Sequence, residues 1–232
     1  MYLLDIEAKQ QTNITSDTSN NNFPDWSPDN QRVAFVSDRD GNEEIYVMNL
    51  KGSDLQRITS DKGRDIHPYF SLDGKYLLFN STRGNASLDI YRYEFATGRT
   101  IRLTDTNDDE TCARYAPDMK RIVYLRNGAL HDDIFILNTT TGLSDNITNT
   151  PKVRDGWPMF SPDGERIYYS SMEKGSHSIY RIRPDGTGKQ QLTNAASDEE
   201  DARVFISADN TFFIYNKRKS SSISIHQAVV NP

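Results

Sequence analysis

Five short apolar runs recur along an otherwise polar chain. They read VAFV at 33–36, YLLF at 76–79, IVYL at 122–125, IYYS at 167–170 and FFIY at 212–215. A strand with one face in water alternates apolar and polar residues, whereas these runs do not alternate cleanly. The pattern therefore predicts one strand per repeat that is covered on both of its faces.

A seven-residue motif precedes each apolar run. It reads PDWSPDN at 24–30, PYFSLDG at 68–74, ARYAPDM at 113–119, PMFSPDG at 158–164 and VFISADN at 204–210. The copies begin 44, 45, 45 and 46 residues apart. Four units also carry an isoleucine followed by an aromatic residue, and a threonine thirteen residues after that aromatic: Thr59, Thr104, Thr148 and Thr193. A repeat of this period indicates a repeat architecture.

Each repeat divides into four strand candidates separated by turn-forming residues. In the first repeat we expect strands at 25–27, 32–37, 44–50 and 55–59. Asp-Gly pairs at 73–74, 163–164 and 185–186 are strong hairpin signals, because glycine accepts the positive φ of a tight turn. Four antiparallel strands per unit, with covered middle strands, predict an all-β fold, a β-propeller of four-stranded blades.

Two repeated positions have structural interpretations. A bulky residue in the first strand should pack between neighbouring blades: Trp26, Phe70, Tyr115, Phe160 and Ile206. An aspartate in the following turn should bond nearby backbone N–H groups: Asp29, Asp73, Asp118, Asp163 and Asp209.

The termini predict how the propeller closes. Residues 1–15 carry the landmarks of a third and fourth strand, and residues 204–216 those of a first and second. We therefore expect one domain over 1–232 with five blades, at about 24–67, 68–112, 113–157, 158–203, and 204–232 closed by 1–23. The segment at 223–225 resembles a second copy of the third strand. Either the closing blade has an extra strand, or the chain is an incomplete six-bladed ring, which is the alternative to five blades.

Composition narrows the class of protein. The net charge of −6 disfavours a general nucleic-acid binder. We expect no membrane insertion, because no apolar stretch approaches the ~20 residues of a membrane-spanning helix. We expect no signal peptide in this chain, because the segment from Met1 lacks a basic start and an apolar core. The single Cys112 cannot form an internal disulfide, and we expect it to be a small buried residue.

The repeat resembles the WD-repeat-like propeller repeat of the TolB family. The resemblance is clearest over 24–59, PDWSPDNQRVAFVSDRDGNEEIYVMNLKGSDLQRIT, and extends over essentially the whole chain. It implies a propeller, typically with six blades, and a protein partner. It also implies a periplasmic or cell-envelope location if the chain is part of a longer exported protein, and a cytoplasmic one otherwise. Function depends on individual sites on the fold.

The position three residues before each motif carries four carboxylates and one amide: Asn21, Asp65, Glu110, Asp155 and Asp201. In a propeller we expect it in the loop that leads to the innermost strand, near one mouth of the central channel. Carboxylates that share a rim repel one another, which favours a calcium or other divalent cation or a basic partner. The candidate metal ligands are Asp65, Glu110, Asp155 and Asp201. The alternative is that each carboxylate caps its own loop, with Arg64 and Arg154 as partners.

Two neighbouring positions vary in chemistry from repeat to repeat, as an asymmetric binding surface requires. One position carries Phe23, His67, Cys112, Trp157 and Arg203, and the other carries Asp25, Tyr69, Arg114, Met159 and Phe205. Exposed aromatic and arginine side chains are typical of binding hot spots. The candidate channel-mouth residues are Asn21, Asp65, His67, Tyr69, Glu110, Arg114, Asp155, Trp157 and Asp201. Neutral drift would produce the same variation.

The preferred functional hypothesis is a non-enzymatic module that binds a protein or peptide at the channel mouth or rim. The acidic rim predicts a basic or cation-bridged ligand. No linear catalytic motif is present, but a site around His67 with Asp65, Glu110 and Arg114 would suit a metal-dependent lyase or hydrolase. The third alternative is a structural or gating domain, because similar propellers precede the catalytic domain of prolyl-oligopeptidase-like enzymes.

Overall fold

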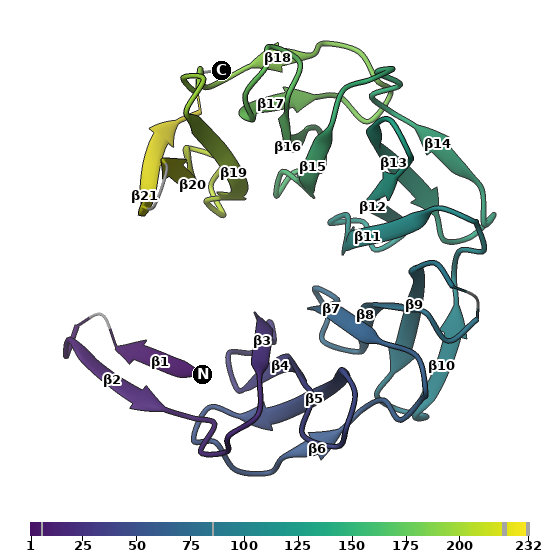
Figure 1. The fold of residues 1–232 in the computed structure, drawn as a ribbon, viewed down its shortest axis with the longest axis vertical. Helices are drawn as coiled ribbons and strands as arrows, with labels where there is room; N and C mark the ends of the chain where they lie inside the picture. Colours follow the sequence, from purple (N-terminus) through teal and green to yellow (C-terminus); the bar gives the residue numbers. More distant parts are fainter. Residues whose placement is uncertain (6, 85, 220–221, 231–232) are drawn as a thin grey trace. The chain divides into compact units, whose positions relative to one another are not determined.

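The computed structural model describes residues 1–5, 7–84, 86–219 and 222–230, and the described residues form strands, turns and loops without a helix. They divide into two compact units, residues 1–107 and 108–232. In the first unit, a hairpin of β1 (Tyr2–Asp5) and β2 (Gln10–Asn13) precedes two four-stranded sheets (Figure 1). These sheets contain β3 (Asn21–Trp26), β4 (Arg32–Ser37), β5 (Glu44–Asn49) and β6 (Gln56–Arg57), then β7 (Asp65–Phe70), β8 (Tyr76–Ser81), β9 (Asp89–Glu94) and β10 (Arg99–Arg102).

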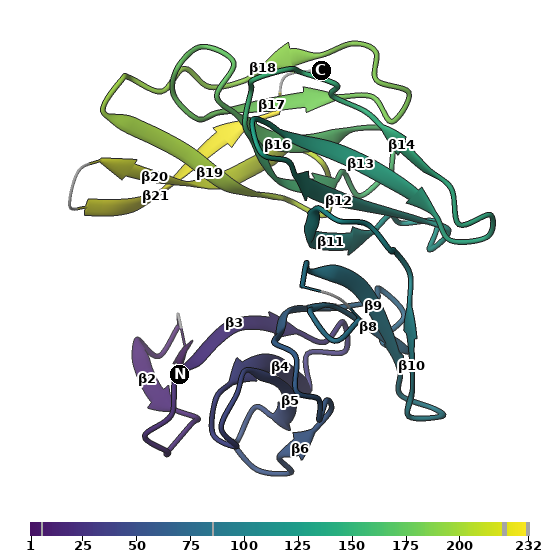
Figure 2. The same cartoon turned by 45° about the vertical axis from the view of Figure 1, so that its right-hand side comes forward.

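The second unit contains two further four-stranded sheets and one three-stranded sheet (Figure 2). They contain β11 (Asp109–Tyr115), β12 (Arg121–Asn127), β13 (Asp132–Asn138) and β14 (Ser144–Asn146), then β15 (Asp155–Phe160), β16 (Ile167–Ser171), β17 (Ser178–Ile182) and β18 (Gln190–Gln191), and finally β19 (Glu199–Ile206), β20 (Phe212–Lys219) and β21 (Ser222–Val229). In each sheet of both units, consecutive strands pair antiparallel. The predicted blades are therefore present as five sheets, and the fold is all-β.

The second strands of the four-stranded blades are largely buried, as their unbroken apolar sequences predict, whereas β20 of the last sheet is mostly half-buried. In β4 and β8, every residue after the first is buried on both faces of the strand. Phe35, Leu77 and Ile122 are completely inaccessible to solvent. Within the first unit, one apolar cluster joins Ile45 and Val47 of one blade to Ile66 and Leu77 of the next. The core therefore lies between neighbouring blades and depends on their stacking.

The first strand of each blade begins earlier than predicted and is interrupted. In the first repeat we expected it at 25–27, but β3 starts at Asn21. Pairing with β4 shifts register between Asn22 and Asp25, which marks a β-bulge. The bulge disrupts the alternation from which a strand is recognised in sequence, so the residues before it resemble a loop.

The repeated packing position behaves as predicted in three repeats. Phe70, Tyr115 and Phe160 are buried. The Arg32 guanidinium of β4 lies 5.4 Å from the Phe70 ring centroid, so this position packs on the second strand of the preceding blade. Trp26 contradicts the prediction, because it is 47% exposed. The sheet before it in the chain is the β1–β2 hairpin, which has no such second strand.

The turn aspartates confirm their predicted role. Ser27 donates its hydroxyl to Asp29, and the backbone N–H of Gln31 donates to the same carboxylate at 3.0 Å. The other four turn aspartates each accept the backbone N–H of the residue two positions later in the chain: Asp73, Asp118, Asp163 and Asp209. These carboxylates therefore stabilise the hairpin between the first two strands of each blade.

The ends of the chain add one finding to the predicted closure. Residues 223–225, the second candidate for a third strand, belong to β21, and β21 pairs with β20 along Phe212–Lys219. Closure of this last sheet by residues 1–23 stays a prediction. No helix among the described residues is long and apolar enough to span a membrane.

Candidate binding surface

The bulge in the first strand of each blade defines five equivalent positions, here called the bulge residues: Phe23, His67, Cys112, Trp157 and Arg203. Their φ angles are 51°, 53°, 56°, 47° and 49°. Each lies at a shift of strand register. Left-handed backbone is unfavourable for non-glycine residues and is common near functional sites, where bulges redirect side chains.

A signal for these bulges is present in the sequence. Proline follows the bulge residue in three repeats, at Pro24, Pro68 and Pro158. Proline has no N–H to donate to a sheet, so inside a strand it is confined to edges, first positions and bulges. The predicted first strand started after the proline, and the bulge was therefore missed.

Bulge residues of adjacent blades contact one another within each unit. In the first unit, the rings of Phe23 and His67 meet edge to face with centroids 4.3 Å apart. In the second unit, the Arg203 guanidinium lies 5.8 Å from the Trp157 ring centroid. The Trp157 ring also lies 6.0 Å from that of His177, whose pKa burial lowers. Each unit thus presents an aromatic contact at its bulges.

The remaining variable residues have different environments. Cys112 is buried as predicted, and burial raises the pKa of its thiol. Tyr69 and Arg114 are half-buried, and the Arg114 guanidinium lies 5.3 Å from the Phe205 ring centroid. Trp157 is half-buried and Arg203 is exposed, so the Trp157–Arg203 pair has surface available for a ligand.

The predicted acidic residues lie at the start of the first strand, not in the loop before it. Asp65, Glu110 and Asp201 are completely buried, and Asp155 is 3% exposed. Three of the four carboxylates pair with a cation of their own blade. Asp65 accepts from Arg83, Glu110 accepts from Arg126 at 2.7 Å, and Asp201 lies 3.2 Å from the Lys217 ammonium. The half-buried Asn21 accepts from Arg39 at 3.0 Å.

Asp155 is the exception among the buried carboxylates. Thr150 donates its hydroxyl to it at 3.3 Å, the hydroxyl groups of Ser171 and Thr148 act on its pKa, and no salt bridge to it exists among the described residues. Burial raises its pKa to about 6, and the hydroxyl groups oppose that shift. Burial also raises the pKa of Asp65, where the Arg83 guanidinium is among the opposing effects.

The prediction that Arg64 and Arg154 pair with the adjacent Asp65 and Asp155 was wrong. Arg64 lies beside Asp65 in the chain but pairs with Glu43, and Arg154 pairs with Asp132 at 2.8 Å. Neighbouring residues on a strand point to opposite faces, so an adjacent arginine faces away from the carboxylate. In the described part of the chain, no group of three or more His, Cys, Asp or Glu side chains is arranged to hold a metal ion.

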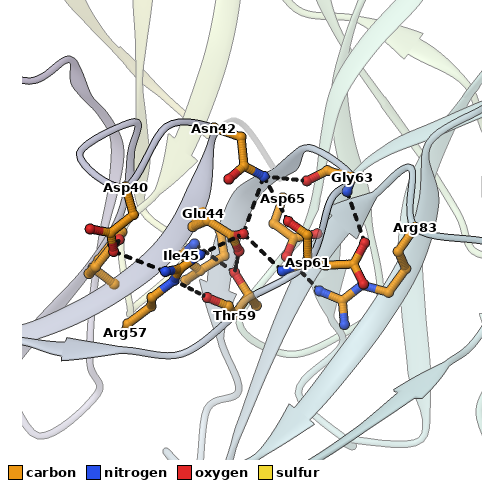
Figure 3. Close-up of polar contacts among 11 residues, drawn as sticks. Asp40, Asn42, Glu44, Ile45, Arg57, Thr59, Asp61, Gly63, Asp65 and Arg83 are labelled. Carbon is orange, nitrogen blue, oxygen red and sulfur yellow. Dashed lines mark hydrogen bonds and ion pairs between the residues drawn. The ribbon is translucent and has the colours of Figure 1, made fainter.

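A second repeated network was missed by the sequence analysis (Figure 3). Thr59 donates its hydroxyl to the buried carboxylate of Glu44 at 2.6 Å and accepts the backbone N–H of Ile45 at 2.9 Å. Arg57 of β6 donates to Glu44 at 3.0 Å. Two sequence positions could have revealed this network. One is the polar residue directly before the isoleucine of each repeat, and the other is the polar residue two positions before the repeated threonine.

The network recurs in the other four-stranded blades with changed partners. Thr104, Thr148 and Thr193 accept the backbone N–H groups of Ile90, Ile134 and Ile179. The side-chain pair is Asp89 with Arg102 in one blade and Asp133 with Asn146 in the next. In the fourth blade the corresponding residues are Ser178 and Gln191. Since every four-stranded blade has a version of it, we interpret this network as part of the scaffold and not as a ligand site.

Comparison with known proteins places the chain among TolB-type propellers. The family described as the TolB beta propeller domain matches residues 1–149. An uncharacterized protein of Agrobacterium fabrum is 31% identical over 203 residues, which cover 82% of this chain and 67% of that protein. The crystal structure of TolB from Acinetobacter baumannii is 31% identical with a TM-score of 0.72, over 83% of this chain and 48% of that one.

Similarity also extends to an enzyme at the level of the fold. An oligogalacturonate lyase solved in complex with manganese has a TM-score of 0.73 and 17% identity, over 99% of this chain and 69% of that chain. Curated TolB relatives are matched over only 31% and 46% of their own lengths. The present chain therefore corresponds to part of such proteins.

Proposed function

Because the chain belongs to the TolB β-propeller family, we propose that it is a non-enzymatic module that binds a protein or peptide, with the bulge residues as contact residues. The observation that carries the proposal is the left-handed backbone at five equivalent non-glycine positions. At these positions the scaffold repeats while the side chains differ in chemistry, from histidine to tryptophan and arginine. That combination suits recognition of an asymmetric ligand.

The predicted mouth residues divide into two roles in this proposal. The exposed or half-buried side chains, such as His67, Tyr69, Arg114 and Trp157, would contact the ligand. Asp65, Glu110 and Asp201 are already bonded to cations of their own blades. These carboxylates would hold the strand start in place, and a calcium ion would have to displace Arg83, Arg126 or Lys217 to reach them.

Peptide selection against the intact chain tests the proposal. A displayed peptide library should yield specific binders, and Trp157→Ala should weaken them about tenfold or more, as truncation of an aromatic hot spot does. Trp26→Ala is the matched control, because Trp26 is the other tryptophan and is exposed in a first strand outside the bulge. Binders that are equally sensitive to both substitutions, or a failure to select any binder, would argue against the proposal.

The lyase and gating alternatives have weaker support on this chain. The similarity to oligogalacturonate lyase is at 17% identity and concerns the fold. His67, around which a lyase site was considered, packs edge to face on Phe23. The binding hypothesis has instead a repeated feature of this chain's own backbone in its favour.

A further inference from the structure

A small cavity opens beside two of the bulge residues in the second unit. Its volume is about 230 Å³, and its polar lining comes from Glu200, Arg203, Asn216 and Arg218, with the Trp157 ring on its wall. Ligand pockets for drug-sized molecules usually occupy ~300–1,000 Å³. This cavity therefore has room for a single amino-acid side chain or a group of similar size.

The backbone directs two of these side chains to the cavity. Trp157 of β15 and Arg203 of β19 occupy the same position in adjacent sheets, and both have positive φ. The Arg203 guanidinium lies 5.8 Å from the Trp157 ring centroid, within the range of a cation–π contact. An aromatic face and a charged, forked donor are thus held side by side at the opening.

The charge balance of the cavity is positive. Arg218 lies 3.7 Å from Glu200, so these two charges compensate each other. Arg203 forms no salt bridge and Asn216 no side-chain hydrogen bond within the described ranges of the chain. One uncompensated positive charge and free N–H donors remain. Such a set is complementary to a carboxylate, which accepts two parallel bonds from a guanidinium.

We propose that this cavity binds a carboxylate of a peptide, from an aspartate or glutamate side chain or from a C-terminus, with Arg203 as the principal donor and Trp157 as the apolar wall. That the ligand is a peptide rests on the function proposed above. That its bound group is a carboxylate is inferred from the lining of the cavity. The acidic rim seen in the sequence predicted a basic ligand. In this unit, however, the carboxylate of Asp201 is buried and paired with Lys217, while Arg203 is exposed.

A neighbouring cavity sharpens the selectivity of the site. It has a volume of about 320 Å³, shares Glu200 and Arg218 with the first, and is lined by Asp198 and Glu199. The Asp198 and Glu199 carboxylates already pair with Lys219 and Lys217, and Arg218 pairs with Glu200, so among the described residues this cavity offers no unpaired Lys or Arg to an anion. A ligand carboxylate is therefore directed to the side of Glu200 on which Arg203 lies.

Tryptophan fluorescence of the intact chain tests the inference. In a Trp26→Phe background, Trp157 is the remaining tryptophan and reports on the cavity directly. N-acetyl-glutamate α-amide and N-acetyl-glutamine α-amide differ only in one carboxylate. We expect saturable binding of the glutamate compound in the millimolar range, which is typical of so small a ligand, and at least about tenfold weaker binding of the glutamine compound.

N-acetyl-alanine and its amide form the second arm and separate a C-terminal carboxylate from a side-chain one. Binding of either carboxylate compound over its amide supports the proposal. Arg203→Gln should weaken that binding about tenfold, and Arg203→Lys should weaken it less because the charge remains. Arg99→Gln removes the same charge from an exposed residue of the first unit and should have no effect.

Three results would overturn the inference: equal affinity for acid and amide, unchanged affinity in Arg203→Gln, or binding of galacturonic acid in preference to both peptide compounds. Each variant must first show the thermal unfolding of the parent chain. A failure here is distinguishable from failure of the proposed function, because the selected peptides can still bind and depend on Trp157. In that case only the carboxylate assignment is lost.

Discussion

Asp155 shows how one residue can depart from a repeated design. Its counterparts Asp65, Glu110 and Asp201 each pair with a cation of their own blade, whereas Asp155 accepts from the Thr150 hydroxyl and has no salt bridge among the described residues. A buried carboxylate without a cation favours its protonated form. The folded state therefore binds a proton here more tightly than the unfolded chain, whose aspartate titrates near pH 3.8.

The pH dependence of stability follows from that shift. Because the pKa of Asp155 is raised to about 6 on folding, its contribution is fully present below pH 3.8 and is lost as the pH rises through 6. Asp155→Asn should therefore raise the free energy of unfolding by about 1–3 kcal/mol at pH 8 and change it little near pH 4. Chemical denaturation at both pH values measures this difference.

Asp29→Asn is the matched control with the opposite sign. The Ser27 hydroxyl and the Gln31 N–H lower the pKa of Asp29, so its stabilisation is present at neutral pH and is lost as the pH falls below its usual range. If Asp155→Asn destabilised the chain at pH 8 as Asp29→Asn should, the charged form of Asp155 would be the stabilising one, contrary to the prediction.

The left-handed backbone of the bulge residues makes a second prediction at this scale. Glycine adopts positive φ freely, whereas a side chain there costs ~1 kcal/mol or more. Arg203→Gly should therefore be more stable than Arg203→Ala by about 1 kcal/mol in thermal or chemical unfolding. At Glu200, an extended residue of the same strand, alanine should be the more stable substitution. The same order of stability at both positions would contradict the assigned backbone.

Among the elements of a blade, the threonine that follows the fourth strand connects two neighbouring segments. Thr59 bonds at once to the Glu44 carboxylate and to the Ile45 N–H, both of which are buried. The sequence analysis identified the threonine from its spacing alone. The two hydrogen bonds explain why spacing and residue type recur together, since only a short hydroxyl side chain both donates and accepts there.

Thr59→Val removes these bonds while keeping the shape of the side chain. We expect it to lower the free energy of unfolding by about 1–3 kcal/mol, because a buried carboxylate and a buried N–H lose a partner. Thr59→Ser retains the hydroxyl and should recover most of that loss. An equal effect of valine and serine would mean that packing of the methyl group, and not the hydroxyl, is what matters at this position.

The sequence predicts an element well where a local pattern of residues determines its bounds, and poorly where pairing across the sheet does. β4 matches its predicted range, Arg32–Ser37, because an apolar run bounded by turn residues is a local signal. The start of β3 at Asn21 was missed, because the bulge at Phe23 breaks the alternation. The partners of Asp65 and Asp155 also escaped prediction, since they depend on which strand face a side chain occupies and on pairing across the sheet.

In the molecule as a whole, stability is distributed over stacked blades whose cores lie between sheets. In the second unit, Tyr168 and Ile179 of one blade join Val204 and Phe213 of the next in one buried cluster. The repeat period of about 45 residues was sufficient to predict this arrangement, because each blade alone has faces that only a neighbour can bury.

Hydrogen exchange should reflect this distribution. Amides of the second strands β4, β8, β12 and β16 lie between two paired strands and are buried, so they should exchange most slowly. Amides of the short outer strands β6 and β18 should exchange orders of magnitude faster. Mass spectrometry of peptides from 32–37 and 56–59 compares them within one blade. Equal protection of the two peptides would contradict the predicted gradient.

The shared backbone of the bulge residues also has an evolutionary consequence. Side chains that are neither β-branched nor proline meet a similar conformational penalty there, so replacement of one by another should leave strand register and turn geometry unchanged. A gene encoding this chain can therefore diversify its recognition chemistry by single substitutions without first acquiring compensating changes in the scaffold. The exposed members of the set, Arg203 foremost, are for the same reason the positions to randomise when a propeller with a new binding preference is to be engineered.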